Sequence, residues 1–296
     1  MATPPSTIVG LADAIGIQFV ELVALAESPP YDRWRAPKRS GGWRQIEAPA
    51  KDLKAAQRWI QHNVIPRLEV HDAAHGSVHG RSSVTFAETH TGAAVLLRMD
   101  VRSFFPSVRF DAVRRTLAAV LEPEVCRMAA SLCTSGCPRA LPQGASTSPG
   151  LANAACLALD HDLEALARSR GARYTRYVDD LAFSFQEPAD AGRLAKEVVE
   201  LLWCHGLEAH EGKTRIMRAH QRQELVGLVV NGDGTPRPSR VSMRRLRAAI
   251  HQAGDASPSE LHRIRGMIAY VSMSNKANGR KLRQQLERSL AGKTTR

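Results

Sequence analysis

Three carboxylates have the residue type and spacing that could do chemistry in this 296-residue chain. Asp100 follows a short apolar run, and Asp179 and Asp180 join two β-prone runs. If those strands are neighbours in one sheet, the three carboxylates meet at one edge, which is unfavourable unless a cation lies among them. Oxygen ligands without nearby His or Cys suit a hard ion such as Mg²⁺. Two such ions ~4 Å apart can activate a hydroxyl and stabilise a leaving oxygen in phosphoryl transfer.

The segments that must position these carboxylates predict an α+β fold. Short apolar or β-branched runs predict strands, and the intervening stretches have helical spacing. The expected strands are 95–99, 174–178, 181–185 and 225–231, and the expected helices lie near 107–121, 150–168 and 190–205.

The N-terminal third predicts helices around a loop. Apolar residues at helical spacing predict one helix over 8–26, ended by Pro29-Pro30, and a second helix over 51–65. Between them, 37–44 is polar and contains Gly-Gly, which indicates a hairpin tip or a phosphate-facing loop.

The basic charge is concentrated at the C-terminal end. Residues 1–212 hold 23 basic and 24 acidic residues, whereas 213–296 hold 18 basic and 5 acidic ones. A capping box at Ser257-Pro258-Ser259-Glu260 predicts that this part is folded and helical. Its clustered cations are Arg244, Arg245, Arg247, Arg280, Lys281, Arg283 and Arg288. A basic module on a near-neutral body indicates a polyanion partner such as nucleic acid.

Composition excludes several other classes. With 43% hydrophobic residues the chain can bury a core, and no apolar run approaches the ~20 residues of a membrane span. The first basic residue is Arg33, so we expect no signal peptide, no membrane partner and a cytoplasmic location. The five cysteines lack paired spacing, which indicates reduced thiols and no structural zinc.

Five sequence blocks in order resemble those of reverse transcriptases. Asp-Asp alone is common in turns, so the pair by itself leaves a purely structural interpretation open. The blocks are Arg98 to Phe105, Leu141 to Pro149, Tyr177 to Asp180, Gly206 to Thr214, and Leu225 to Asn231. The resemblance implies a right-hand polymerase: an N-terminal helix (1–30), fingers (31–94), a palm with an antiparallel sheet (95–235, with a fingers insertion at about 106–145) and a basic helical thumb (236–296).

Further segments resemble bacterial retron-type enzymes. They are Pro37 to Gln57, Ala74 to Ser82 and Tyr174 to Tyr177. The chain departs from the retron pattern at two elements. In Asn-Ala-x-x-His the Asn is replaced by Phe86, with His90 kept, and Val-Thr-Gly is replaced by Leu225-Val226-Gly227.

The resemblance implies roles for individual residues. Asp100, Asp179 and Asp180 would bind two Mg²⁺ ions, and Phe105 would exclude a ribose 2′-hydroxyl. Gln143, Gly144, Lys213 and Arg81 would contact the incoming dNTP. Lys38 and Arg44 would contact triphosphate or template. The thumb cations Arg244, Arg245, Arg247, Arg280 and Lys281 would hold nucleic acid.

The implied function is an RNA-directed DNA polymerase that copies part of a cognate structured non-coding RNA into single-stranded DNA. Priming would start from a 2′-hydroxyl of that RNA, and a retron system would serve antiphage defence with a separate effector protein. Two alternatives stay open: a group II intron-like or other defence-associated reverse transcriptase, and a non-catalytic RNA-binding scaffold. His71, His75 and His79 are spaced by four, but the glycines among them disfavour a metal site.

Overall fold

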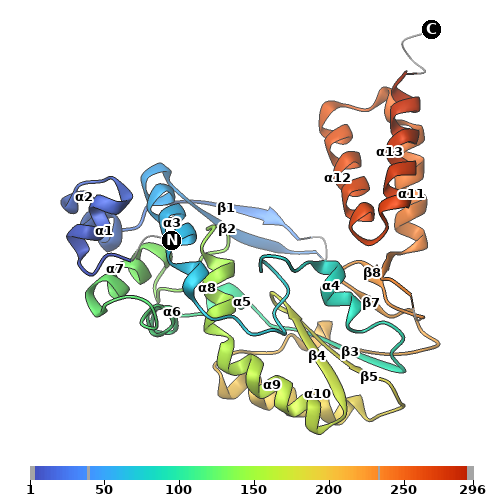
Figure 1. Cartoon of the computed structure of the whole chain (residues 1–296), viewed down its shortest axis with the longest axis horizontal. Coiled ribbons are helices and arrows are strands. Elements are labelled where there is room, and N and C mark those ends of the chain that lie inside the picture. The colour runs from blue at the N-terminus through green and yellow to red at the C-terminus, as the bar shows by residue number, and fades with distance from the viewer. Residues whose placement is uncertain (1–3, 39–40, 233, 292–296) are drawn as a thin grey trace.

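The computed structural model describes residues 4–38, 41–232 and 234–291. It has mixed helices and antiparallel sheets, in the arrangement of fingers, palm and thumb (Figure 1). The fold class expected from the sequence is confirmed.

The palm is a four-stranded antiparallel sheet in the order β4-β5-β3-β6. Its strands are β3 (Val95–Asp100), β4 (Ala172–Tyr177), β5 (Asp180–Phe185) and β6 (Arg215–Arg218). Side chains alternate between its two faces. Leu97 and Phe183 belong to the main core, to which the helices α9 (Leu157–Ser169) and α10 (Ala191–Cys204) also contribute.

A second apolar cluster covers the other face of the sheet. Leu96 and Ala182 lie in it with Phe86 of helix α4 (Ser83–Glu88). Val84 and Ala87 of α4 also belong to it, and Leu225, Leu228 and Val230 come from a small hairpin, β7 (Glu224–Leu225) and β8 (Leu228–Val229), and the residue after it. The sheet is therefore packed on both sides, and its carboxylate-bearing end is fixed by two cores.

The fingers begin with the hairpin expected around 37–44. Strand β1 (Tyr31–Pro37) pairs antiparallel with β2 (Trp43–Pro49), and helix α3 (Lys51–Asn63) follows, then a 3₁₀ turn, η1 (Ile65–Arg67). The turn contains residues 39–40, which lie outside the described residues.

The single N-terminal helix predicted over 8–26 is wrong. The chain forms α1 (Ile8–Ile15) and α2 (Phe19–Glu27), with a bend of 100° between them. Gly16 ends α1 in the left-handed conformation at φ 85°, and Gln18 forms a capping box with Glu21 that starts α2. Apolar periodicity continued across the break and concealed it.

Three other expected elements are interrupted. The predicted helix over 107–121 is α5 (Phe104–Ser107) and α6 (Phe110–Leu117), with α7 (Pro123–Cys133) after it. The predicted helix over 150–168 is α8 (Ser148–Ala155) and α9, which meet at Cys156. The strand predicted over 225–231 is the β7–β8 hairpin, because Val226 and Gly227 both have positive φ, 42° and 86°.

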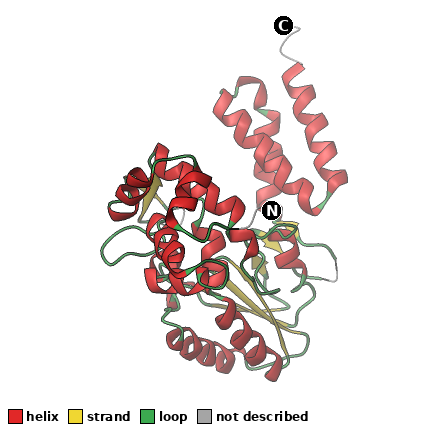
Figure 2. Cartoon of the chain, turned by 60° about the vertical axis from the view of Figure 1, so that its left-hand side comes forward, coloured by secondary structure: helices red, strands yellow, loops and turns green. Residues whose placement is uncertain are grey.

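The thumb is three helices with their own core. They are α11 (Arg240–His251), α12 (Pro258–Ser274) and α13 (Lys276–Ala291); β9 (Arg237–Pro238) precedes them, and the 3₁₀ turn η3 (Ala253–Asp255) lies between α11 and α12. Leu246, Ile264 and Leu282 are buried in that core. The capping box predicted at Ser257 is confirmed. The three helices stand apart from the body in both cartoon views (Figures 1 and 2).

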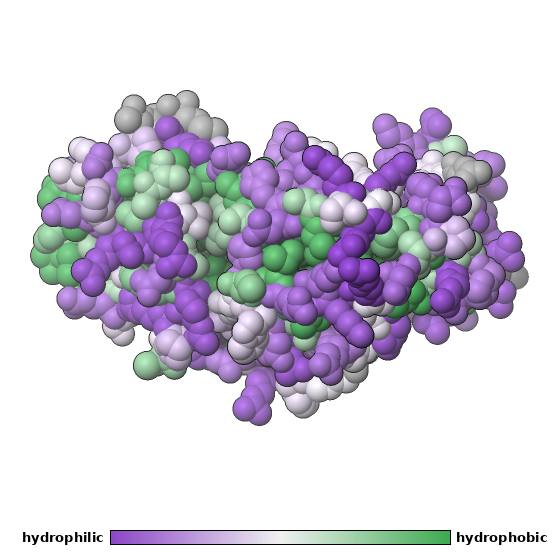
Figure 3. Space-filling view, turned by 90° about the horizontal axis from the view of Figure 1, so that it is seen from below, coloured by the Kyte–Doolittle hydropathy of each residue, from purple (hydrophilic) through white to green (hydrophobic). Residues whose placement is uncertain are grey.

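The surface is mostly hydrophilic, with apolar areas at separate places (Figure 3). One lies at the end that carries the N-terminal helices, where Val9, Phe19 and Val20 are exposed. Within the described residues, no single helix has the length and apolar composition to span a membrane; the bent pair α1 and α2 meets that test only when the two are joined.

His90 ties the second cluster to the palm strands. It is fully buried, with Nδ1 2.7 Å from Ser184 Oγ on β5 and Nε2 2.7 Å from Thr175 Oγ1 on β4. Burial is the main reason that the pKa of His90 is lowered from 6.5 to about 3. The folded protein therefore holds this imidazole neutral.

This histidine should make the fold acid-sensitive. Because its folded pKa lies below its unfolded pKa, the unfolded state takes up a proton as pH falls below about 6.5. We expect the free energy of unfolding to fall by about 2 kcal/mol between pH 7.5 and pH 5 through His90 alone. Urea unfolding at both pH values, with His90→Gln as a non-titrating control, measures it. Equal pH dependence in the two proteins would contradict the assignment.

Candidate active site

The three predicted carboxylates meet at one edge of the palm sheet. Asp100 ends β3 and is directly opposite Asp180, the first residue of β5. Asp179 lies in the turn between β4 and β5, and its carbonyl oxygen accepts a hydrogen bond of 2.9 Å from Val101 N. The neighbouring-strand geometry expected from the sequence is thus present.

Two cations neutralise this cluster. Lys213 Nζ donates to both carboxylate oxygens of Asp100, at 2.8 and 2.7 Å. Arg98 donates from Nε and Nη2 to Asp180 Oδ1, at 2.9 and 2.7 Å. Lys213 reaches the site from a short 3₁₀ turn, η2 (Glu211–Lys213), which directly precedes β6. Among the described residues, Asp179 forms no ion pair with a basic side chain.

The carboxylates disfavour one another's charge. Burial raises the pKa of Asp179 to about 6, and the charges of Asp180 and Asp100 add to the rise. Burial also raises the pKa of Asp180, against the opposing effect of Arg98. Crowded, desolvated carboxylates of this kind mark functional sites more often than they mark purely structural ones.

The site suits a divalent cation by its donor chemistry. Its ligands would be hard carboxylate oxygens, and a bound cation would offset both the burial and the carboxylate repulsion that raise the pKa of Asp179. Within the described residues, no group of three His, Cys, Asp or Glu side chains is already arranged around one point. Instead Asp100 and Asp180 are each turned to a basic side chain.

Two adjacent phenylalanines follow the first carboxylate. Phe104 is buried, and Phe105 is only partly buried in the short helix α5, with the ring centroids 5.6 Å apart. Phe104 thus lies in the core and Phe105 nearer the surface, and a role of Phe105 beside the nucleotide sugar stays a prediction.

The loop that carries Gln143 and Gly144 is fastened to the fingers hairpin. Glu47 N on β2 donates 2.9 Å to the carbonyl of Gln143. A Cβ on Gly144 would lie 2.7 Å from the Glu47 carbonyl oxygen, and Gly144 has φ +141°. Close backbone approach explains the glycine here. Whether Gln143 and Gly144 touch a nucleotide stays a prediction.

Arg81 is turned toward its own loop. Its Nη1 donates to the carbonyls of His71, Asp72 and Ala74 at 2.7–2.9 Å, and its Nη2 lies 2.6 Å from Asp72 Oδ1. In this arrangement Arg81 organises the loop that precedes α4. A contact with the nucleotide would require it to give up some of these bonds.

The two cations predicted on the fingers lie on the β1–β2 hairpin. Lys38 is exposed beside the turn, and Arg44 is on β2. Arg44 Nε is buried and has no hydrogen-bond partner among the described residues.

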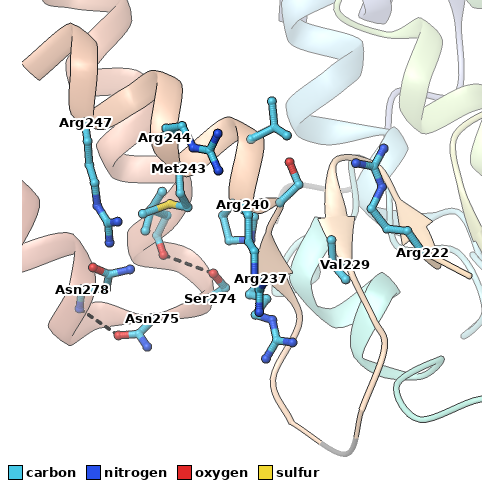
Figure 4. Close-up of a pocket in the computed structure, with 14 residues that line it drawn as sticks. Arg222, Val229, Arg237, Arg240, Met243, Arg244, Arg247, Ser274, Asn275 and Asn278 are labelled. Carbon is cyan, nitrogen blue, oxygen red and sulfur yellow. Dashed lines mark hydrogen bonds between the residues drawn. The ribbon is translucent and has the colours of Figure 1, made fainter. Parts of the chain in front are cut away.

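The thumb cations surround a cavity of about 860 Å³. Arg237 comes from β9, and Arg240, Arg244 and Arg247 come from α11, opposite Asn275, which follows α12, and Asn278 at the start of α13 (Figure 4). None of the described residues that line the cavity is acidic. Arg245 is outside the lining, and Arg280 and Lys281 are exposed on α13.

Two of the three spaced histidines, His71 and His75, form hydrogen bonds within the protein. His71 Nδ1 accepts from Ala73 N, and His75 Nδ1 lies 2.8 Å from Thr85 Oγ1, so the spaced histidines serve separate contacts. All five cysteines are free.

Three residues for which the sequence predicted no role form ion pairs in or beside the candidate site. Arg98 pairs with Asp180, and Arg176 and Asp160 form a fully buried ion pair behind the catalytic edge. The available signal was a charged residue inside a predicted buried strand. Arg98 also shares a strand face with Asp100 by the two-residue period.

Comparisons with known proteins find sequence relatives over most of the chain. Residues 36–242 match the reverse transcriptase (RNA-dependent DNA polymerase) family. The retron Mx162 reverse transcriptase of Myxococcus xanthus is 40% identical, with 93% of this chain and 65% of that protein covered. The retron Mx65 reverse transcriptase of the same organism is 38% identical, with 92% and 69% covered. This chain thus spans less than two thirds of the Mx162 protein's length.

A solved structure supports the fold alone. Telomerase from Candida albicans, in complex with a fragment of telomeric RNA, aligns with a TM-score of 0.52 and 12% sequence identity. The alignment covers 87% of this chain and 55% of that one.

The inward position of Arg81 is testable by a conservative change. Arg81→Lys keeps the charge but cannot reproduce three carbonyl bonds and the Asp72 contact. We expect the free energy of unfolding to fall by about 1–3 kcal/mol in urea titrations. Unchanged stability together with a raised KM for dNTP would instead assign Arg81 to the nucleotide.

Proposed function

This chain belongs to the reverse transcriptase family and to its retron type, and from that premise we propose that it is an RNA-directed DNA polymerase acting on a cognate structured RNA. It copies part of that non-coding RNA into single-stranded DNA. The observation that carries the proposal is the meeting of Asp100, Asp179 and Asp180 at one sheet edge, within the segment that matches the family.

The three carboxylates are proposed to hold divalent ions, two Mg²⁺ in the full reaction. When bound, these ions favour deprotonation of the attacking hydroxyl and stabilise the charge that leaves with pyrophosphate. Lys213, which donates to Asp100 at 2.7 and 2.8 Å, is close enough to the site to neutralise triphosphate charge. Phe105 is proposed to exclude the 2′-hydroxyl of ribonucleotides, and Gln143 and Gly144 to bind the incoming dNTP.

The cellular setting is also a proposal. By family resemblance the first nucleotide is joined to a 2′-hydroxyl of the RNA, and the system serves antiphage defence with a separate effector protein. The five free cysteines support a reducing, cytoplasmic location.

Primer extension tests the catalytic proposal. With Mg²⁺, a primed RNA template and dNTPs, we expect incorporation by the wild type and a loss of at least about 1,000-fold in Asp179→Asn plus Asp180→Asn. The matched control is Asp111→Asn plus Glu187→Gln, which removes two exposed carboxylates elsewhere. No incorporation by the wild type with its own RNA would contradict the enzyme. RNA binding without incorporation would favour the scaffold alternative.

The thumb cavity supports a nucleic-acid grip. Five arginines line it, and of these only Arg222 has an ion pair, with Glu224, among the residues that the structure describes. The mutual repulsion of the other four, which are exposed, would be relieved by a polyanion. Phosphates of the template–product duplex or of the partner RNA would supply that charge. Lys38, Arg44, Arg245, Arg280 and Lys281 are proposed as further contacts along the same nucleic acid.

The dependence of RNA binding on salt concentration measures how many phosphate contacts the cavity arginines make. Arg240→Gln, Arg244→Gln and Arg247→Gln together should weaken RNA binding and reduce the slope of log K against log salt by about 2–3. The control replaces Arg114, Arg168 and Arg193, which removes the same charge from exposed sites outside the cavity. An identical slope in the cavity variant and the wild type would mean that the RNA is held elsewhere.

A further inference from the structure

Arg176 is a fully buried cation beside the catalytic turn, the segment Tyr177–Asp180. Its side chain has no exposure, and Asp160 on α9 is equally buried. Arg176 Nε and Nη2 donate to the two oxygens of Asp160 at 2.8 and 2.6 Å. The hydroxyl of Tyr174 also donates to Asp160, at 2.7 Å.

The third guanidinium nitrogen of Arg176, Nη1, contacts groups other than Asp160. Arg176 Nη1 donates 3.1 Å to the carbonyl of Val178 and 3.0 Å to Asn153 Oδ1 on α8. Asn153 in turn donates 2.8 Å to the carbonyl of Gly76. One side chain therefore links the catalytic turn to two helices and to the loop that precedes α4.

The same loop is also bound to the strand backbone. Arg176 N donates 2.7 Å to the carbonyl of Ala73, and His75 N donates 2.8 Å to the carbonyl of Arg176. A Cβ on Gly76 would lie 2.6 Å from Val178 Cγ2 and 2.8 Å from Val178 N. The loop thus packs directly against the catalytic turn, with no space for a side chain.

Val178 needs such support. Its φ is +59°, a conformation that β-branched residues rarely adopt. Strained residues of this kind persist only where their surroundings determine them. Here the surroundings are the Arg176 bond to the Val178 carbonyl and the Gly76 contact on its amide side.

A buried ion pair is a weak source of stability, because well-packed apolar residues of similar volume often do as well. The contacts of this ion pair instead reach residues that surround the proposed active site. Besides Val178, the guanidinium carbon lies 5.8 Å from the ring centroid of Phe104, which contacts Phe105. The arrangement therefore connects the catalytic turn and the phenylalanine pair through one rigid group.

We propose that Arg176, oriented by Asp160 and Asn153, is a positioning residue that holds Val178 in its strained conformation and thereby fixes where Asp179 lies. Gly76 completes the support by packing against Val178 and Tyr177 of the same turn. This inference rests on the proposed polymerase activity, and it concerns how the carboxylates are held rather than which residues react.

Three variants test it by different routes. Asn153→Ala removes the link between Arg176 and Gly76 but leaves the ion pair. Gly76→Ala pushes on Val178 directly. Arg176→Lys keeps the charge and loses the bridging nitrogens. In primer extension each should lower kcat by about 10- to 100-fold, as expected for a displaced catalytic group, with KM for dNTP within about twofold of wild type.

Two controls separate positioning from general stability. Leu163→Ala leaves a cavity in the buried face of α9, and Gly266→Ala adds a Cβ in α12, where no atom lies within 4 Å. Both should keep kcat near wild type below the unfolding transition. Hydrogen exchange gives a readout besides activity: segment 172–185 should exchange faster in Asn153→Ala and Gly76→Ala than in either control.

The outcomes are distinct. The inference is overturned if Asn153→Ala and Gly76→Ala keep kcat within about twofold of wild type, or if Leu163→Ala reproduces their loss and their exchange. If Arg176→Lys does not fold, the results for Asn153→Ala and Gly76→Ala still decide whether the inference holds. An inactive wild type would defeat the polymerase proposal, whereas the exchange measurement would continue to test the network.

Discussion

Repulsion between carboxylates is the constraint on which the rest of this structure depends. Asp100 and Asp180 face each other across β3 and β5, and Asp179 lies beside them. Like charges in a desolvated place separate unless the backbone is held. The sheet is held by an apolar core on each face, and the turn by the Arg176 bond to Val178 and the packing of Gly76. The two neighbouring cations, Lys213 and Arg98, offset the charge that this packing concentrates.

The uneven charge along the chain parallels these contacts. Residues 1–212, which contain the three carboxylates, are close to neutral. The basic part starts with Lys213, which contacts Asp100, and continues into the arginine-lined cavity of the thumb. The acidic cluster and most of the positive surplus therefore lie in different parts of one chain, and Lys213 joins them.

The features that could be predicted from the sequence depend on short motifs or on repeating apolar patterns. Strands β3 to β5 follow from short apolar runs, and the start of α12 follows from the Ser257 capping box. The missed helix breaks at Gly16 and Cys156 lie inside continuous helical periodicity, so the apolar pattern gave no sign of them. The inward turn of Arg81 depends on three carbonyls brought near by the fold, which residue types do not reveal.

The residues of the candidate site also differ in whether the sequence could predict their positions. Its carboxylates ended recognisable strands and could be placed together by strand pairing alone. The Arg176–Asp160 pair could not, because it joins a strand to a helix across the main core, with Asn153 on yet another helix. Charged residues within apolar segments were the one available hint that a buried partner existed.

The two departures from the retron pattern lie in one apolar cluster. Phe86 replaces an Asn, and Leu225-Val226 replace Val-Thr, although Phe86 and Leu225 are 139 residues apart in the sequence. In the fold, Phe86 and Leu225 are both fully buried in the second cluster, and Val226 packs against it. An isolated amide or hydroxyl buried there would need a hydrogen-bond partner, so apolar side chains suit both places. His90, the part of the pattern that is kept, instead bonds to Thr175 and Ser184 on the palm strands. The changes are therefore confined to the apolar side of this cluster and leave intact the link between it and the strands that carry Asp179 and Asp180.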